Sequence, residues 1–302
     1  MTKRTIRVGS RESKLAVAQS RLVMEAVAAA HPDIQLELVT MKTTGDIILD
    51  RTLDQIGGKG LFVKELDRAL AAGEIDLSVH SLKDLPMELA EGLPLVAFSR
   101  RADPRDALVL PQGAETLREE GTIGSSSRRR VVQLEELFPK ASFRSVRGNL
   151  QTRLAKLEGE DYDALVLAAA GLRRLGMEGR IARCFTPDEM IPAAGQGILA
   201  VQGREGEDYS FLDCVEDSAS RACAVAERAF VTALDGGCSS PIAAYASLEE
   251  GELLLRGLYY DENEGRAFRG TIRGAAADGA DLGRELADRL KNKTGVAYEN
   301  AR

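Results

Sequence analysis

The chain has 302 residues, of which 44% are hydrophobic and 29% are charged, a composition typical of a globular protein with two or three domains. No apolar run approaches the roughly 18 residues of a membrane span, and the first residues lack a signal-peptide pattern. We therefore expect a cytoplasmic protein with reduced cysteines and no membrane partner. Two histidines, no CxxC pair and no tryptophan argue against a metal site and against nucleic-acid binding by base stacking.

The net charge of −7 is unevenly distributed along the chain. Residues 203–302 contain 19 acidic and 12 basic side chains, whereas residues 100–153 contain 11 basic and 7 acidic ones. A locally basic segment within an acidic protein favours a small anionic ligand over a nucleic-acid backbone.

The first third of the chain alternates between strand and helix patterns. Strands are predicted at 4–9, 34–40 and 77–82, and helices at 13–30 and 61–72. This order predicts a parallel sheet covered by helices. The connection at 42–60 is long for a compact domain, which predicts that part of it is mobile.

A second α/β unit follows, and the pattern then changes. Its strands are predicted at 107–110, 122–124, 142–146 and 164–167, and its helices at 129–138 and 149–158. A long helix at 218–234 precedes strands at 242–248, 252–260 and 265–272 and a helix at 280–292. Because these last strands follow one another without crossover helices, we predict a separate small α+β domain.

Polar residues follow two strands of the first unit. Arg11 and Ser13 lie between the first strand and its helix, where free backbone amides can bind an anion, although Ser13 could equally be a plain helix cap. Lys83 and Asp84 follow the third strand, and Asp84 could stabilise a developing cation or transfer a proton, with a solvated turn as the alternative. His80, inside that strand, is predicted to be a hydrogen-bonded structural residue.

Arginines follow three successive strands of the second unit. They occur in 125–130, at Arg147 and Arg153, and at Arg173 and Arg174. Their planar guanidinium groups match carboxylates, and the GxxxxGK[ST] phosphate loop is missing. Together they predict a cleft lined for several carboxylates or phosphates.

Cys238 lies in a turn between a helix and Pro241, directly after Gly236 and Gly237. Such a displayed thiol could be a nucleophile, a tether or only a small residue at a helix end. No neighbouring histidine could activate it, which argues against a cysteine hydrolase. The small residues at 191–197 read as a hinge that returns the chain to the first domain, or as a simple turn.

Six ordered motifs resemble the porphobilinogen deaminase (hydroxymethylbilane synthase) family along almost the whole chain. They occupy residues 9–13, 57–62, 80–86, 147–149, 195–197 and 237–238. The resemblance implies a transferase of haem and porphyrin biosynthesis that joins four porphobilinogen molecules head to tail, with loss of ammonia, into hydroxymethylbilane. It also implies a dipyrromethane cofactor held by a thioether to Cys238, and a catalytic role for Asp84 in stabilising the azafulvenium cation.

The resemblance further assigns residues to binding. The cofactor-binding residues would be Cys238, Lys83, Asp84, Ser127, Arg129, Arg130, Arg147 and Gly148. The substrate-binding residues would be Arg11, Ser13, Arg147, Arg153, Arg174 and Gln196, with Lys59 in the mobile loop. Two positions depart from the family pattern, because Arg128 replaces an apolar residue and Gln55 replaces a lysine.

The expected fold is two α/β lobes like those of periplasmic binding proteins plus a small C-terminal α+β domain with an antiparallel sheet. Domain 1 would comprise 1–98 and 197–215, domain 2 would comprise 102–193, and domain 3 would comprise 217–302 with the cofactor cysteine. The family implies a monomer with no metal and no nucleic-acid partner. The alternatives are a non-catalytic two-lobed anion-binding protein and a nucleotide-dependent phosphotransferase.

Overall fold

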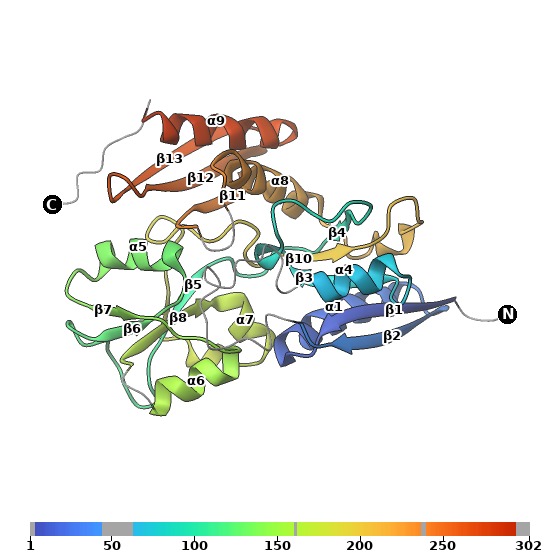
Figure 1. Cartoon of the computed structure of the whole chain (residues 1–302), viewed down its shortest axis with the longest axis horizontal. Helices are drawn as coiled ribbons and strands as arrows, with labels where there is room; N and C mark the ends of the chain where they lie inside the picture. Colours follow the sequence, from blue (N-terminus) through green and yellow to red (C-terminus); the bar gives the residue numbers. More distant parts are fainter. Residues whose placement is uncertain (1–3, 44–62, 160–161, 237–239, 294–302) are drawn as a thin grey trace. The chain divides into compact units, whose positions relative to one another are not determined.

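The structure is a computed structural model that describes residues 4–43, 63–159, 162–236 and 240–293 (Figure 1). Its contacts divide the chain into two compact units. Unit 1 comprises Met1–Ala102 and Gly197–Arg221, and unit 2 comprises Asp103–Gln196 and Ala222–Arg302. Unit 2 thus holds all but the first residues of the predicted second and third domains, and the finer division into three domains stays a prediction.

Unit 1 is built on a five-stranded sheet with the order β2-β1-β3-β10-β4 (Figure 1). The strands are β1 (Arg4–Arg11), β2 (Ile34–Met41), β3 (Leu77–Ser81), β4 (Leu95–Phe98) and β10 (Leu199–Gln202). β1 is parallel to β2 and β3, whereas β10 is antiparallel to β3 and β4. The prediction of a parallel sheet is confirmed for the three predicted strands, β1, β2 and β3. The sequence does not predict the antiparallel strand β10, because a four-residue buried run is too short to show an alternating pattern.

The helices described in unit 1 are α1 (Lys14–Ala30) and α4 (Lys64–Ala71), close to their predicted positions. Two short 3₁₀ turns, η1 (Leu82–Asp84) and η3 (Ser210–Leu212), complete the unit. α1 packs Val23 and Val27 against Ile6 and Val8 of β1, which forms the centre of the apolar core. This packing fixes the position at which β1 ends and α1 begins.

Unit 2 contains a second five-stranded sheet, with the order β7-β6-β8-β5-β9 (Figure 1). Its strands are β5 (Asp106–Val109), β6 (Thr122–Gly124), β7 (Ser142–Arg144), β8 (Ala164–Ala168) and β9 (Arg183–Cys184). Its helices are α5 (Arg128–Leu137), α6 (Leu150–Gly159), α7 (Ala169–Arg174) and the turn η2 (Glu178–Arg180). β6, β7 and β8 run parallel, whereas β5 runs antiparallel to β8 and to β9.

The C-terminal part of unit 2 is an α+β layer. It consists of α8 (Ser218–Ala233), β11 (Ala243–Glu249), β12 (Glu252–Asp261), β13 (Arg266–Ala275), the turn η4 (Ala276–Asp278) and α9 (Gly279–Lys291). The three strands form one antiparallel sheet. Gly270 and Gly274 leave room for leucines of α9, since a Cβ on Gly274 would lie 2.9 Å from the side chain of Leu282. The predicted fold class, α/β lobes plus a C-terminal α+β layer, is confirmed.

Segment 191–196 joins this layer to the sheet of unit 2. Ile191 packs against Ala243 in β11. Glu227 of α8 is fully buried, and its carboxylate accepts hydrogen bonds from the backbone N–H groups of Gly195 and Ala246, both at 2.7 Å. A buried carboxylate with two amide donors fixes this connection firmly.

Candidate functional site

Unit 1 gathers four predicted site residues at one edge of its sheet. β1 and β3 are parallel neighbours, so their C-terminal ends reach the same edge. β1 ends at Arg11, and η1 follows β3 with the half-buried Lys83 and the exposed Asp84. Ser13 caps α1, because its hydroxyl accepts a hydrogen bond from the N–H of Ala16 at 3.2 Å. The cap alternative for Ser13 is thus confirmed, while its role in ligand binding stays a prediction.

A small cavity opens beside Asp84. Its lining also includes Arg11 and His80, together with Ala16, Val63, Val79 and Ser81. Its volume of about 30 Å³ is enough for a water molecule. The side chains of Asp84, Arg11 and His80 border this small space, whose lining is otherwise mostly apolar.

His80 forms the buried floor of this region. It is only 6% exposed, and its Nε2 lies 2.8 Å from the hydroxyl oxygen of Ser78. Burial lowers the pKa of His80 to about 4, so the imidazole is neutral at neutral pH. The prediction of a hydrogen-bonded structural histidine is confirmed.

Unit 2 presents its site residues at the corresponding edge, where the parallel strands β6, β7 and β8 end. The loop after β6 is bound to the loop after β7, because the Ser126 hydroxyl donates to the carbonyl oxygen of Val146 at 2.7 Å. β5 runs the opposite way, which brings its first residue, Asp106, opposite Ala168 at the end of β8. This edge therefore collects residues from four strands.

Two features of this edge leave hydrogen-bond donors for a ligand. Ser127 occupies the N-cap of α5, yet its side chain makes no capping hydrogen bond. Arg147 is half-buried and forms no ion pair or hydrogen bond within the described ranges of the chain. Gly148 follows with φ 114°, and a Cβ there would lie 2.8 Å from the Cβ of Thr152, so this turn favours glycine.

Arg129 and Arg130 are buried, at 5% and 7% exposure, around a carboxylate that the sequence did not single out. Arg129 Nη1 donates to Asp106 Oδ2 at 2.8 Å, and Arg130 donates to Asp106 Oδ1 through Nε at 3.0 Å and Nη2 at 2.8 Å. Asp106 is missed by sequence reasoning because it opens an apolar strand 23 residues before its first partner. An acidic residue at the start of a buried strand is the signal that could have revealed it.

The remaining predicted residues have varied surroundings. Gln196 is fully buried and donates to the carbonyl oxygen of Pro104 at 2.6 Å and to Asp106 Oδ1 at 3.1 Å. Arg153 donates to the carbonyl oxygen of Gly148 at 2.9 Å. Burial lowers the pKa of Arg174 to about 10. The binding roles of all three stay predictions.

Some predictions fall outside the described residues. These are the cofactor cysteine Cys238, the loop residue Lys59 and most of the predicted mobile segment 42–60. Of the two departures from the family pattern, Gln55 also lies outside them. Arg128 is described, and it forms an exposed ion pair with Glu262 at 2.6 Å.

Comparison with known sequences defines the class of this protein. A family model for the dipyrromethane cofactor-binding domain of porphobilinogen deaminase matches residues 6–211, and a model for the C-terminal domain of that enzyme matches residues 221–292. The chain is thus a transferase with a dipyrromethane cofactor. It belongs to the porphobilinogen deaminase family, and it joins porphobilinogen head to tail into the linear tetrapyrrole hydroxymethylbilane.

Relatives support this membership over nearly the full length. The porphobilinogen deaminase of Ruminiclostridium cellulolyticum is 54% identical over 287 residues, covering 95% of this chain and 98% of the relative. That of Acetivibrio thermocellus is 53% identical, covering 93% and 96%. The non-catalytic alternative and the phosphotransferase alternative are therefore wrong.

Similar solved structures are more distant. The effector-binding domain of BenM with benzoate has a TM-score of 0.42 at 13% identity, covering 71% of this chain and 90% of that one. The periplasmic aliphatic sulphonate binding protein SsuA from Escherichia coli has a TM-score of 0.40 at 10% identity, covering 76% and 70%. Similarity at this level is no evidence for a shared ligand.

Proposed function

We propose that Cys238 holds the dipyrromethane cofactor through a thioether and that Asp84 is the catalytic carboxylate. The observation that carries the tether is the cation-rich edge of unit 2, and the exposed carboxylate of Asp84 at the sheet edge of unit 1 separately supports the catalytic role. Cys238 follows α8 in unit 2, between the described residues Gly236 and Ser240. The tether and the arginine-rich edge therefore belong to the same compact unit.

The residues of unit 2 fit a dipyrromethane, whose pyrrole rings carry acetate and propionate groups. Arg129 and Arg130 share a single carboxylate, Arg147 makes no protein ion pair among the described residues, and the start of α5 lacks a side-chain cap. All three features favour binding of anions. When bound, the cofactor is the primer to which substrate is joined. Its holders would be Lys83, Asp84, Ser127, Arg129, Arg130, Arg147 and Gly148.

Asp84 is suited to stabilise positive charge. Asp84 is exposed and borders the small cavity, so its carboxylate can accept hydrogen bonds from pyrrole N–H groups and offset the cation that remains when ammonia leaves. The substrate carboxylates would bind to basic and polar groups, with Lys59 acting from the loop. These groups are Arg11, Ser13, Arg147, Arg153, Arg174 and Gln196.

Intact-protein mass tests the tether. The wild-type chain should carry an adduct equal to two linked pyrrole units, and Cys238→Ala should carry none and be inactive. Cys214→Ala is the matched control, because Cys214 is an exposed cysteine in unit 1. It should keep the adduct. An adduct that survives Cys238→Ala, or an active wild-type chain without adduct, would contradict the proposal.

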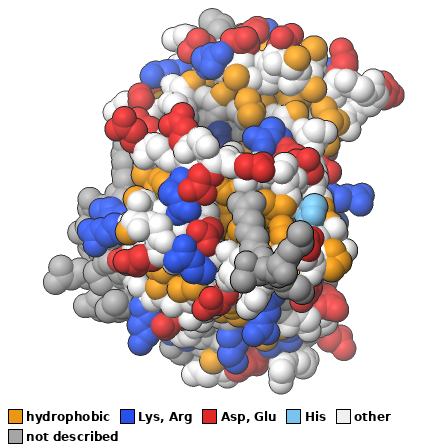
Figure 2. All heavy atoms as spheres, turned by 90° about the vertical axis from the view of Figure 1, so that its right-hand side faces the viewer, with side chains coloured by type: hydrophobic (Ala, Val, Ile, Leu, Met, Phe, Trp, Pro, Cys, Tyr) orange, Lys and Arg blue, Asp and Glu red, His pale blue; other side chains and the backbone are white. Residues whose placement is uncertain are grey.

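We also propose that the protein acts as a cytoplasmic monomer without a nucleic-acid partner. Acidic and basic side chains are interspersed among the described residues on the face shown in Figure 2, which does not suit a phosphate backbone. Among the described helices, none is both long and apolar enough to cross a bilayer. Light scattering coupled to size exclusion should give a mass close to 32.6 kDa. A dimer mass would contradict the monomer proposal.

A further inference from the structure

Among the described residues, three aspartates each pair with two arginines. The two arginines around Asp103, which are Arg105 and Arg173, are 38% and 51% exposed, so solvent offsets much of their charge. The clusters around Asp76 and Asp106 differ in how their charge is balanced. In unit 1, Asp76 lies between Arg7 and Arg204, and in unit 2, Asp106 lies between Arg129 and Arg130. The first cluster lies at the start of β3 and the second at the edge with the predicted ligand residues. Comparing them shows which properties belong to any such cluster and which are special to the second.

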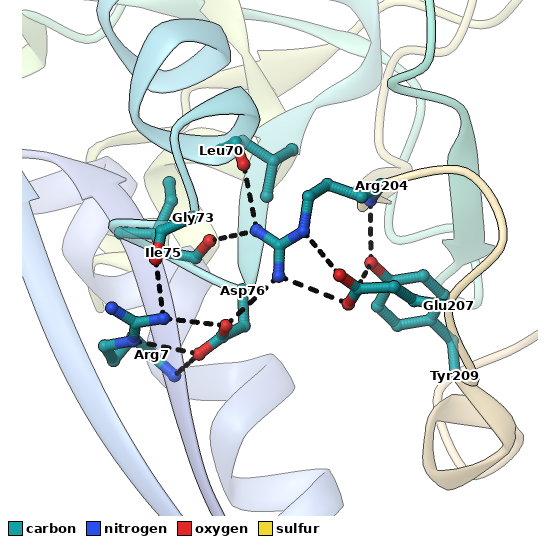
Figure 3. Close-up of polar contacts among 8 residues, drawn as sticks. All are labelled: Arg7, Leu70, Gly73, Ile75, Asp76, Arg204, Glu207 and Tyr209. Atoms are coloured by element: carbon teal, nitrogen blue, oxygen red, sulfur yellow. Dashed lines mark hydrogen bonds and ion pairs between the residues drawn. The ribbon is translucent and has the colours of Figure 1, made fainter.

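The Asp76 cluster is balanced in charge (Figure 3). Arg7 donates to both oxygens of Asp76, through Nε at 3.1 Å and Nη2 at 2.9 Å. Arg204 donates to Asp76 at 3.2 Å and also to Glu207 at 2.5 Å, so two carboxylates face two guanidinium groups. Arg204 also donates to the carbonyl oxygens of Leu70 and Ile75. This cluster needs no further anion.

The Asp106 cluster has a surplus positive charge. Asp106 has no exposed surface, and it is the only carboxylate that pairs with Arg129 or Arg130 among the described residues. Arg130 is held at three sides, by Asp106 and by the carbonyl oxygen of Val166 at 3.0 Å. Arg129 uses only Nη1, which donates to Asp106 and to the carbonyl oxygen of Ile191 at 2.8 Å. Its Nε and Nη2 have no partner within the described ranges.

A surplus charge in a buried place is costly unless an anion approaches it. The unused donors of Arg129 and the nearby uncapped start of α5 give one carboxylate a place to bind. Asp106 accepts a hydrogen bond from Nη1 of Arg129 and so orients this guanidinium group. Gln196 in turn donates a hydrogen bond to Asp106. The side chains of Arg129, Arg130 and Gln196 therefore all depend on the carboxylate of Asp106 for their positions.

We propose that Asp106 is a positioning residue that orients Arg129 and Arg130 for a single carboxylate group of the dipyrromethane cofactor. Asp106 itself contacts no ligand. With one carboxylate and two guanidinium groups, the cluster has a net charge of +1. One ligand carboxylate would neutralise this charge, as Glu207 does in the Asp76 cluster. The inference rests on the proposed cofactor-binding role of Arg129 and Arg130.

The test compares Asp106→Asn with Asp76→Asn in the purified holoenzyme. Each variant removes the charge of the shared carboxylate with little change in shape, and each should lower the melting temperature. Asp106→Asn should also reduce the fraction of chains with the cofactor mass. Turnover per total chain should fall about tenfold or more with the loaded fraction, because charge-assisted hydrogen bonds to one cofactor carboxylate are misaligned, while the KM of the loaded chains for porphobilinogen should change less. Asp76→Asn should keep the cofactor mass and the turnover of the wild type.

Asp106→Glu keeps the negative charge but adds a methylene group, so it tests the position of the carboxylate separately from its charge. It also replaces Asp106→Asn as the test if that variant does not fold. It should show the same cofactor loss. A fully loaded Asp106→Asn or Asp106→Glu enzyme would overturn the proposal. Equal cofactor losses in Asp76→Asn and Asp106→Asn would also overturn it, since the effect would then be general destabilisation. If the proposed attachment at Cys238 is wrong, the adduct will still be present in Cys238→Ala, so the two proposals can fail independently.

Discussion

Unit 1 and unit 2 have similar sheets, and each places its predicted site residues where parallel strands end, but the polar groups buried beneath those ends differ. Beneath Asp84 in unit 1 lies His80, which burial keeps neutral. Beneath the loops of unit 2 lie two guanidinium groups and one carboxylate. The α1 start in unit 1 is capped by Ser13, whereas the α5 start in unit 2 has no side-chain cap. A neutral histidine beneath an accessible carboxylate suits the proposed reacting role of Asp84, and two buried guanidinium groups suit the proposed binding of anionic groups.

Removing the carboxylate from unit 1 should give the largest effect on turnover. Asp84→Ala should lower kcat roughly 100- to 1000-fold, the loss typical of one group aimed at developing charge, while the chain folds and keeps its cofactor mass. Steady-state kinetics with intact-mass analysis checks this. Glu88→Ala is the control, since Glu88 is an exposed carboxylate four residues later. Wild-type turnover in Asp84→Ala would remove Asp84 from the mechanism.

The neutral floor of unit 1 gives a pH-dependent prediction. The folded pKa of His80, about 4, lies below its ordinary value of 6.5, so the unfolded chain binds a proton more readily. The stability of the folded state should therefore fall as the pH falls below 6.5, and this loss should level off below pH 4. From these two pKa values, His80 should account for about 2 kcal/mol of lost unfolding free energy between pH 7 and pH 5.

Denaturant unfolding of the wild type and of His80→Asn at the two pH values measures this contribution. The variant should lose about 2 kcal/mol less than the wild type on acidification. His31→Asn, which alters the other histidine in the chain, is the control variant. Identical pH dependence of His80→Asn and the wild type would show that the imidazole is not held neutral by burial.

The sequence predicts the edge of unit 1 better than the edge of unit 2. Arg11 and Asp84 follow strands whose order is β-α-β, and this local pattern is enough to bring them to one edge. The Asp106 cluster requires knowledge that β5 runs antiparallel to β8, which a strand pattern does not contain. Arginines also read as exposed residues in a sequence, so the burial of Arg129 and Arg130 depends on tertiary pairing with Asp106. For the same reason β10, which pairs with strands more than 100 residues earlier, is missed.

The anion-holding edge of unit 2 should respond through binding more than through turnover. Arg147→Met removes a half-buried guanidinium group that has no ion-pair partner among the residues described, so the folded chain loses little when the charge is removed. We expect KM for porphobilinogen to rise about tenfold or more, the equivalent of one charge-assisted hydrogen bond to a carboxylate. Arg144→Met is the matched control, because Arg144 is an exposed arginine three residues earlier that lies 4.3 Å from the ring centre of Tyr162. If Arg147→Met instead lowers kcat at unchanged KM, Arg147 acts in the reaction itself, as proposed for Asp84. The proposed division between a catalytic edge in unit 1 and an anion-binding edge in unit 2 would then be wrong.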